Sequence, residues 1–262
     1  MPDPGFELVC EIEPPTRPDL KHVRHQIGVL SSIAGSFLIP DNHIGRATVS
    51  SVAVAHEVEA MGGRSIACLN ARDRNLLGFQ RDLLTAEAYG VDQFLLVRGD
   101  EPRVGGRTSE LNVQTMLREA RAFDIATERA DGRRLRLGAV AGLGPLPAWK
   151  READFLFLQV GFSLGAFLRW REKEQPPNAV YAGVIVLASS AMARSLARTI
   201  PAIEIPDQLV ERVDRDPTAG IEAACELLLA IRDSGLFQGV HLVPVSRYRL
   251  VAARLEQLLG QI

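Results

Sequence analysis

Eight short apolar runs succeed one another along this chain, and helical or polar stretches separate each run from the next. Most of the runs are apolar throughout, which is typical of strands buried on both faces of a parallel sheet. Eight βα units in series can close a ring, so we predict an α/β fold, a single-domain (β/α)8 TIM barrel. The predicted strands are Phe6–Glu13, Ser36–Pro40, Ser65–Asn70, Gln93–Gly99, Leu135–Ala141, Phe155–Val160, Val180–Leu187 and Val240–Val245.

An open, doubly wound sheet is the competing architecture for such a series. That fold normally carries a glycine-rich phosphate loop after its first strand, whereas the first strand here ends in EIEPP. The chain has 262 residues, close to the roughly 250 of a typical barrel, and no linker divides it. We therefore predict one catalytic domain over residues 1–262. After the fifth predicted strand, GLGPLPAWKREAD is too rich in glycine and proline to form a full helix.

Composition argues against several classes of function. Lys and Arg number 30 against 32 Asp and Glu, a formal net charge of −2, whereas a nucleic-acid-binding domain should be basic. No signal-peptide pattern opens the chain, and no apolar run approaches the ~20 residues that cross a bilayer. The three cysteines form no CxxC pair, and His241 and the other histidines lack metal-ligand spacing. We expect a cytoplasmic protein with a small-molecule substrate and no metal, nucleic-acid or membrane partner; homo-oligomerisation stays open.

Polar side chains stand at the ends of several apolar runs. Glu11 and Glu13 end the first run, Asp100 follows the fourth, and Gln159 lies near the end of the sixth. The carboxyl ends of the strands form the face of a parallel barrel where active sites lie, so these side chains should gather at one mouth. A carboxylate is costly to bury there unless it is solvated or paired. The pattern therefore favours an enzyme.

Each of these residues has a chemical and a structural interpretation. Glu11 and Glu13 are two apart in a predicted strand and should share one face, where closely spaced carboxyl groups favour keeping a proton, as a general acid requires. Alternatively, one of them binds a neighbouring arginine or a helix N-terminus and takes no part in the chemistry. Asp100 either takes part in the chemistry or caps the loop that follows. Gln159 either reads the edge of a heterocycle, with its donors and acceptor, or bonds to the backbone as a structural amide.

The segment LNARDRN, residues 69–75, gathers further polar side chains after the third strand. Asp73 is predicted to cap the next helix. Arg72 and Arg74 could bind a phosphate or a carboxylate, or could be the solvated start of that helix.

Together these motifs resemble the methylenetetrahydrofolate reductase family, whose members are flavin-dependent β/α barrels. The match covers most of the chain, and the order of the motifs at matching barrel positions is more specific than any one of them. The matching segments are ExxPP from Glu11 to Pro15, DN at Asp41 and Asn42, RDRN from Arg72 to Asn75, RDLLTAEAYGVDQFLLVRGDEP through Asp100, EADFLFLQ ending at Gln159, AGVIVL with IPAIEIPDQLVERV, and VSR ending at Arg247.

The resemblance implies reduction of 5,10-methylenetetrahydrofolate to 5-methyltetrahydrofolate, a step of one-carbon metabolism that serves methionine biosynthesis. NAD(P)H would reduce a bound FAD, which would pass hydride to the folate. Glu11 would be the general acid that opens the imidazolidine ring, and Asp100 would stabilise the resulting cation. Substrate contacts would come from Gln159, Arg247 and Glu13. Flavin contacts would come from Asn42, Cys68, Arg72, Arg98 and Gly99.

Three departures from the family pattern accompany these matches. Cys68 begins the triplet that stands where the family usually has His-x-Thr. The short loop after the fifth strand lacks the family's aromatic and histidine residues, and Lys150 is out of register. Met192 replaces a common glutamine. Two alternatives therefore stay open: a reductase of the same substrate that takes hydride directly from the nicotinamide without flavin, and a folate- or pterin-binding subunit without reductase activity of its own.

Overall fold

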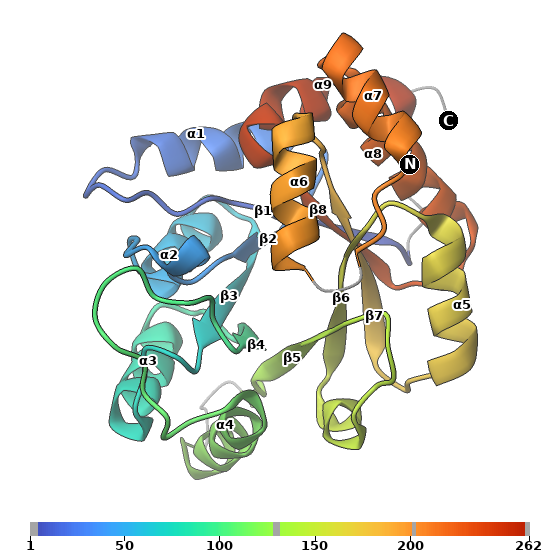
Figure 1. The fold of residues 1–262 in the computed structure, drawn as a ribbon. Helices are drawn as coiled ribbons and strands as arrows, with labels where there is room; N and C mark the ends of the chain where they lie inside the picture. The colour runs from blue at the N-terminus through green and yellow to red at the C-terminus, as the bar shows by residue number, and fades with distance from the viewer. Residues whose placement is uncertain (1–4, 128–131, 201–202, 260–262) are drawn as a thin grey trace.

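The computed structural model describes residues 5–127, 132–200 and 203–259. It is a closed barrel of parallel strands in the order β1-β2-β3-β4-β5-β6-β7-β8, with helices around the outside (Figure 1). Pairing of β1 with β8 closes the ring. The predicted (β/α)8 barrel is confirmed. That one domain spans residues 1–262 stays a prediction, because both ends of that range lie outside the described residues.

All eight predicted strands are present, and their ends differ from the prediction by a few residues. In β1, for example, the strand ends at Glu11 and not at Glu13, because Pro14 and Pro15 cannot donate to a sheet. The strands are β1 (Glu7–Glu11), β2 (Ser36–Ile39), β3 (Arg64–Asn70), β4 (Gln93–Val97), β5 (Arg136–Ala141), β6 (Phe155–Gly161), β7 (Ala179–Ile185) and β8 (Gly239–Val243).

The helices cover the outside of the barrel in the order of the strands (Figure 1). Between β5 and β6 there is only a short 3-10 helix, η2 (Ala148–Glu152), as the glycine- and proline-rich loop predicts. The α-helices are α1 (Lys21–Leu30), α2 (Ser51–Ala60), α3 (Leu76–Ala88), α4 (Val113–Thr127), α5 (Leu164–Glu174), α6 (Ser190–Thr199), α7 (Asp207–Arg215), α8 (Ala219–Asp233) and α9 (Tyr248–Leu259), and the other 3-10 helices are η1 (His43–Gly45) and η3 (Val245–Arg247).

Strand side chains alternate between the barrel interior and the layer beneath the helices. In β1, for example, Val9 packs inside the barrel while Cys10 joins the larger outer core. The interior is filled by apolar and aromatic side chains, so the barrel is a packed core without a channel. Its buried members are Val9, Leu38, Ile66, Cys68, Leu95, Phe155, Phe157 and Tyr181.

A polar cluster fills the end of the barrel where the strands begin. Glu7 accepts hydrogen bonds from the Ser36 hydroxyl at 2.5 Å, from Arg64 at 2.8 Å and from the Tyr181 hydroxyl at 2.5 Å. Burial, and after it the hydrogen bond to Glu7, raise the pKa of Tyr181, so its hydroxyl remains a donor. Among the described residues, this cluster forms a floor beneath the apolar interior.

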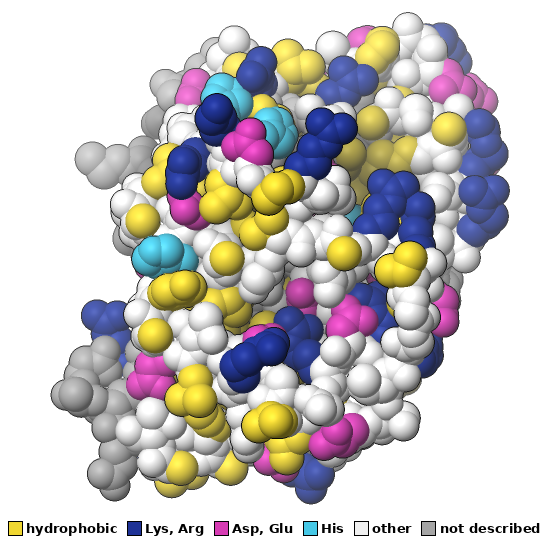
Figure 2. All heavy atoms as spheres, turned by 90° about the vertical axis from the view of Figure 1, so that its left-hand side faces the viewer, with side chains coloured by type: hydrophobic (Ala, Val, Ile, Leu, Met, Phe, Trp, Pro, Cys, Tyr) yellow, Lys and Arg dark blue, Asp and Glu magenta, His cyan; other side chains and the backbone are white. Residues whose placement is uncertain are grey.

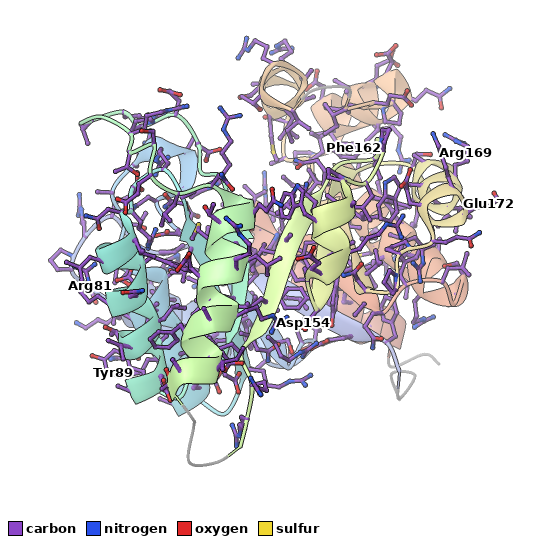
Figure 3. The ribbon with its side chains drawn as sticks, turned by 90° about the horizontal axis from the view of Figure 1, so that it is seen from below. Arg81, Tyr89, Asp154, Phe162, Arg169 and Glu172 are labelled. Carbon is purple, nitrogen blue, oxygen red and sulfur yellow. The ribbon has the colours of Figure 1, made fainter. Side chains whose placement is uncertain are left out.

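The segment between β7 and β8 adds helices at the opposite end. Figure 3 shows Asp154 before the start of β6 and Phe162 after its end, so the mouth formed by the carboxyl ends of the strands lies on the Phe162 side. The orange helices α6 and α7 lie at that end (Figure 3). Phe162 packs against the small core that joins them to the barrel. The buried residues of that core are Leu187, Ala193, Leu209, Val213 and Ala219.

The face that carries α1, α2 and α3 mixes acidic, basic and apolar side chains (Figure 2). None of the helices in the described ranges combines the length and the apolar character that a bilayer crossing requires.

Gly239 begins β8 where this strand passes close to β1. An added Cβ atom would lie 1.9 Å from the carbonyl oxygen of Glu7, so backbone would have to move. We expect Gly239→Ala to lower the free energy of unfolding by about 1–3 kcal/mol, the usual cost of overpacking. The control is Gly28→Ala in α1, where an added Cβ meets nothing within 4 Å and should stabilise the helix by up to ~1 kcal/mol. Equal urea midpoints for the two variants would contradict this prediction.

Candidate active site

Glu11 and His241 form a pair at the mouth of the barrel. Glu11 is the last residue of β1, and His241 lies in β8, which pairs with β1. Nε2 of His241 lies 3.3 Å from Oε2 of Glu11, and the exposed fractions of the two side chains are 10% and 18%. A shielded carboxyl group beside an imidazole is an arrangement suited to proton transfer.

The pair rests on the apolar interior. The His241 ring stacks on Phe157 of β6, with centroids 5.2 Å apart and an interplanar angle of 26°. Cys68 of β3 is buried in the same interior. Burial first, and then the charge of Glu11, raise the pKa of the Cys68 thiol, which therefore stays protonated. Glu11 and His241 thus stand at the border between a dry interior and the mouth.

Glu13 does not continue this arrangement. Ile12, which follows the end of β1, is buried in the outer core, and Glu13 is exposed beyond it. The backbone amide and carbonyl of Glu13 bond to the side chain of Gln26, at 3.3 and 3.5 Å. The prediction that β1 extends to Glu13 is therefore wrong, and strand alternation no longer places its side chain beside Glu11. A substrate contact by Glu13 stays a prediction.

Asp100 follows β4, which lies across the barrel from β8 and β1 in the strand order. Its side chain is exposed, and Oδ2 accepts a hydrogen bond from the amide of Ile44 at 2.8 Å. The Asp100 carbonyl accepts a hydrogen bond from Arg72. Asp100 therefore joins the loop after β4 to the loop after β2, which differs from the predicted alternative of a cap on the loop that follows Asp100. It does so at the rim opposite Glu11 in the strand order, and its part in the chemistry stays a prediction.

The loop after β2 is strained at the point where it meets Asp100. Asn42 and Ile44 have φ angles of 48° and 57°, and such values are rare for a β-branched residue. Arg103 fixes the loop from outside: its Nε donates to the Ile44 carbonyl at 3.2 Å, and its amide donates to Gly45 at 2.9 Å. Tertiary contacts, and not local preference, therefore set the position of this rim.

A buried ion-pair network joins the ends of β2 and β3. Arg74 bonds to Asp41 and, at 2.8 Å, to Asp82. Asp41 also accepts from the backbone amide and the Nδ2 of Asn70, at 3.0 and 2.6 Å. Burial alone would lower the pKa of Arg74, but its two carboxylate partners more than reverse this, so the guanidinium stays charged.

Asp73 belongs to a second, adjoining network. Arg72 donates to both of its carboxylate oxygens at 2.5 Å, Asn42 donates at 2.8 Å and Asn70 at 3.1 Å. These bonds, the one from Arg72 first, lower the pKa of Asp73 to about 2. The prediction that Asp73 caps α3 is wrong, because Asn75 is the cap and accepts from the Gly78 amide at 2.8 Å.

Asp73 should make the stability of the protein depend on pH in the acid range. Its folded-state pKa of about 2 lies below the unfolded value of ~3.9, so its contribution is fully present well above ~3.9 and is lost as the pH falls through about 2. We expect the difference in urea midpoint between the wild type and Asp73→Asn to be constant from about pH 7 to about pH 5 and to shrink toward about pH 2. A difference that does not shrink would contradict this.

Gln159 lies at an irregular point of β6. Between the pairs Phe157↔Tyr181 and Val160↔Gly183, β6 has one residue more than β7. Gln159 is part of this bulge and is half-buried. Bulges often re-aim side chains beside active sites, which is compatible with a ligand contact at the mouth. That contact stays a prediction.

Arg247 ends η3, directly after β8, and is half-buried at the same end of the barrel as Glu11. Its backbone amide donates to Pro244 at 2.9 Å, which closes the turn out of the strand. This backbone bond does not involve the side chain, so the contact of Arg247 with the folate stays a prediction.

The residues that the resemblance assigns to a flavin are mostly engaged within the protein. Asn42 and Arg72 share a carboxylate partner. Cys68 is 5% exposed inside the barrel. Gly99 has a φ of +85°, and a Cβ there would lie 3.2 Å from the Cβ of Arg72. Arg98 alone among the five is exposed. The hydrogen bonds of Asn42 and Arg72 and the burial of Cys68 do not fit open contacts of these three side chains with a flavin.

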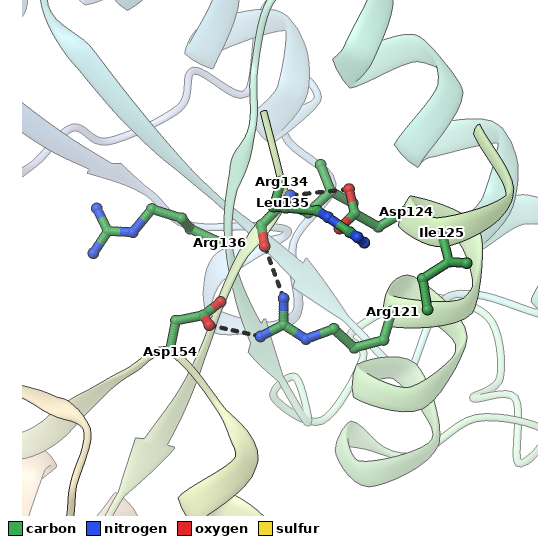
Figure 4. A pocket seen from close by; sticks show the side chains of 7 residues that line it. All are labelled: Arg121, Asp124, Ile125, Arg134, Leu135, Arg136 and Asp154. Carbon is green, nitrogen blue, oxygen red and sulfur yellow. Dashed lines mark hydrogen bonds and ion pairs between the residues drawn. The ribbon is translucent and has the colours of Figure 1, made fainter. Parts of the chain in front are cut away.

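A cavity of about 380 Å³ lies away from the mouth, between α4 and the starts of β5 and β6 (Figure 4). Arg121 donates to Asp154 at 2.7 Å, and Asp124 accepts from the Leu135 amide at 3.0 Å. These pairs anchor the beginnings of two strands, and that end of a barrel serves stability more often than chemistry. Among the described residues, no group of three or more His, Cys, Asp or Glu side chains could hold a metal ion.

His241 is the site residue that the sequence reasoning missed, because only metal-ligand spacing was considered for it. The signal was available in the strand pattern. His241 stands two residues after Gly239 at the start of β8, and β8 closes the barrel beside β1. Strand alternation together with barrel closure therefore places it on the face that holds Glu11.

Comparisons with known proteins show the fold. No protein-family model and no curated protein matches the sequence. Among solved structures, an uncharacterised protein from Clostridium thermocellum that binds two copies of 5-methyl-5,6,7,8-tetrahydrofolic acid is similar, with a TM-score of 0.64, 11% identity and coverage of 97% of this chain and 96% of that one. The EDTA monooxygenase of Chelativorans sp. BNC1 has a TM-score of 0.60 and 8% identity, with coverage of 98% and 93%. The spore cortex-lytic enzyme of Bacillus cereus has a TM-score of 0.54 and 12% identity, with coverage of 95% and 74%. Because the sequence identities are this low, the similarities show a shared β/α-barrel fold and no more.

Proposed function

We propose that the protein is an oxidoreductase that reduces 5,10-methylenetetrahydrofolate to 5-methyltetrahydrofolate with NAD(P)H. The observation that carries the proposal is the shielded Glu11–His241 pair at one side of the mouth, with the carboxylate of Asp100 on the opposite rim. The folate bound by the Clostridium thermocellum protein of similar fold supports the class of ligand.

In this proposal Glu11 gives its proton to N10 of the bridged folate. The bond between the bridging carbon and N10 breaks, its electron pair stays on N10, and the carbon becomes a 5-iminium cation. Asp100 stabilises that cation from the opposite rim, where a fixed carboxylate needs little reorganisation. Hydride from the nicotinamide then converts the iminium carbon into the methyl group. Atoms and charge balance with one NAD(P)H and one proton consumed.

Two further side chains would orient the folate. The amide of Gln159 offers both a donor and an acceptor, which suits the edge of a pterin. The guanidinium of Arg247 suits the carboxylates at the other end of the molecule. Neither contact is required for the proton step, so their loss should raise KM more than it lowers kcat.

The reductase is tested by the oxidation of NADH or NADPH that depends on methylenetetrahydrofolate, with the methyl product identified by mass spectrometry. We expect oxidation that requires both substrates. If the protein binds the folate but turns over neither nucleotide, the reductase proposal is rejected.

The visible spectrum tests FAD separately. FAD is predicted by the resemblance, but three of its five predicted contacts are hydrogen-bonded or buried within the protein. We therefore expect the purified protein to lack the absorbance of oxidised flavin and to turn over without added FAD. A yellow protein, or turnover only after reconstitution with FAD, would contradict this expectation and restore the flavin-dependent route.

A folate-binding protein without reductase activity is the second candidate. The bond from Ile44 to Asp100 favours it, because it occupies one oxygen of the carboxylate assigned to the cation. Such a protein would bind tetrahydrofolates in a calorimetric titration and leave both nucleotides unoxidised.

A further inference from the structure

We propose that His241 holds the proton that restores Glu11 after each turnover. The inference rests on the proposed reductase and adds to it a positioning residue, since His241 acts through Glu11 and not on the substrate. Its starting point is Nε2 of His241, a buried atom without a hydrogen-bond partner among the described residues, 3.3 Å from Oε2 of Glu11.

An unsatisfied ring nitrogen in this position calls for a functional explanation. A buried polar atom without a partner costs about 1–3 kcal/mol, and such atoms are rare. The ring is held by its stacking on Phe157, 5.2 Å between centroids, and its residue is 8% exposed. Catalytic hydrogen bonds are often long in unliganded enzymes and tighten when the ligand binds. A small shift of Glu11 would turn this contact into a hydrogen bond.

Three other charged or titratable groups come from the strands and loops near the pair. Cys68 from β3 is a buried thiol in the barrel interior. Asp41, at the end of β2, is bound by Arg74. Arg247 follows β8, and its guanidinium offers hydrogen-bond donors and no acceptor atom. Among these described side chains, the imidazole is the one whose ring nitrogen can both give a proton to Glu11 and take one back.

The proton cycle is then complete. When Glu11 protonates N10, it becomes a carboxylate beside the His241 imidazolium. The Nε2–H bond breaks, an O–H bond forms on Oε2 of Glu11, and the neutral imidazole takes a proton from an acid of the solvent, hydronium or a buffer acid, whose conjugate base stays in solution. One proton enters per turnover, which equals the one proton that the reduction consumes.

Chemical rescue with imidazole tests this role. We expect His241→Ala to lower turnover by about tenfold to a hundredfold, a smaller loss than that of the general acid itself. Free imidazole should fill the space beside Phe157 and restore turnover in a saturable way, more strongly at pH values where it carries a proton. Glu11→Gln should not respond to imidazole. His56→Ala, in the exposed part of α2, is the matched control and should keep wild-type turnover with no response.

His241→Gln separates proton transfer from packing. Glutamine keeps a donor nitrogen for Glu11 but cannot pass a proton. We therefore expect this variant to turn over as slowly as His241→Ala and to show a changed pH profile of turnover. This variant tests the inference even if the alanine variant fails to fold. Wild-type turnover in His241→Gln, or a folded alanine variant that imidazole does not restore, would overturn the inference and leave the reductase standing. A wild-type protein without turnover would remove the proposed function first, before any variant is compared.

Discussion

Glu11→Gln should lower turnover by a factor of about 10²–10⁴, the usual contribution of a general acid. Glutamine has nearly the shape of glutamate and fills the same space at the end of β1, beside His241. In the proposed reaction it would have no acidic proton to give to N10, so the imidazolidine ring would have to open without assistance. The loss should therefore fall on kcat, because the proposed contacts with the folate would be unchanged.

The measurement is folate-dependent oxidation of the nucleotide, together with a calorimetric titration of the folate. Glu172→Gln is the matched control: it makes the same chemical change on the exposed side of α5 (Figure 3). We expect that variant to equal the wild type. Unchanged turnover in Glu11→Gln would remove the general-acid role, whatever its effect on binding.

Arg74→Met should lower the free energy of unfolding by about 3–5 kcal/mol, the cost of leaving a buried charge without its partner. Arg74 is 11% exposed and Asp41 is 4% exposed, so water screens their interaction weakly. Methionine fills similar volume but leaves the Asp41 carboxylate with only the donors of Asn70. The ends of β2 and β3 should loosen together.

Urea unfolding at neutral pH measures this loss, and Arg81→Met provides a matched control. Arg81 bonds to Asp82 at 2.9 Å, a carboxylate that Arg74 also binds, but Arg81 is 74% exposed. Exposed pairs contribute about 0–1 kcal/mol, so this variant should remain close to the wild type. Equal urea midpoints for the two variants would mean that the buried network contributes no more to the free energy of unfolding than an exposed ion pair does.

The barrel could be predicted from the sequence because its signal is repeated. Most strands are largely apolar runs, as in Ser36–Ile39, and the eight runs are separated by stretches long enough for a crossover. A misjudged end, such as Glu13 for β1, leaves the fold unchanged because the other strands still close the ring. The fold can therefore be predicted correctly even when the end of one strand is misplaced.

The site was harder to predict because its geometry depends on contacts between distant segments. Glu11 and Asp100 were found because polar residues after apolar runs mark strand ends. The bond from Ile44 to Asp100 joins residues 56 apart, and His241 meets Glu11 only when the barrel closes. Asn75, and not Asp73, caps α3 because the carboxylate is drawn away by Arg72. Such competition between hydrogen-bond partners cannot be predicted from a local sequence pattern.

The cluster around Glu7 has a kinetic consequence. Because Ser36, Arg64 and Tyr181 close the lower end of the described barrel with Glu7, the folate and the nicotinamide of the proposed reaction would both have to enter at the mouth. Both would have to reach the iminium carbon from the same side, so each should obstruct the other when supplied in excess. Inhibition by high concentrations of either substrate would be the signature of that shared passage.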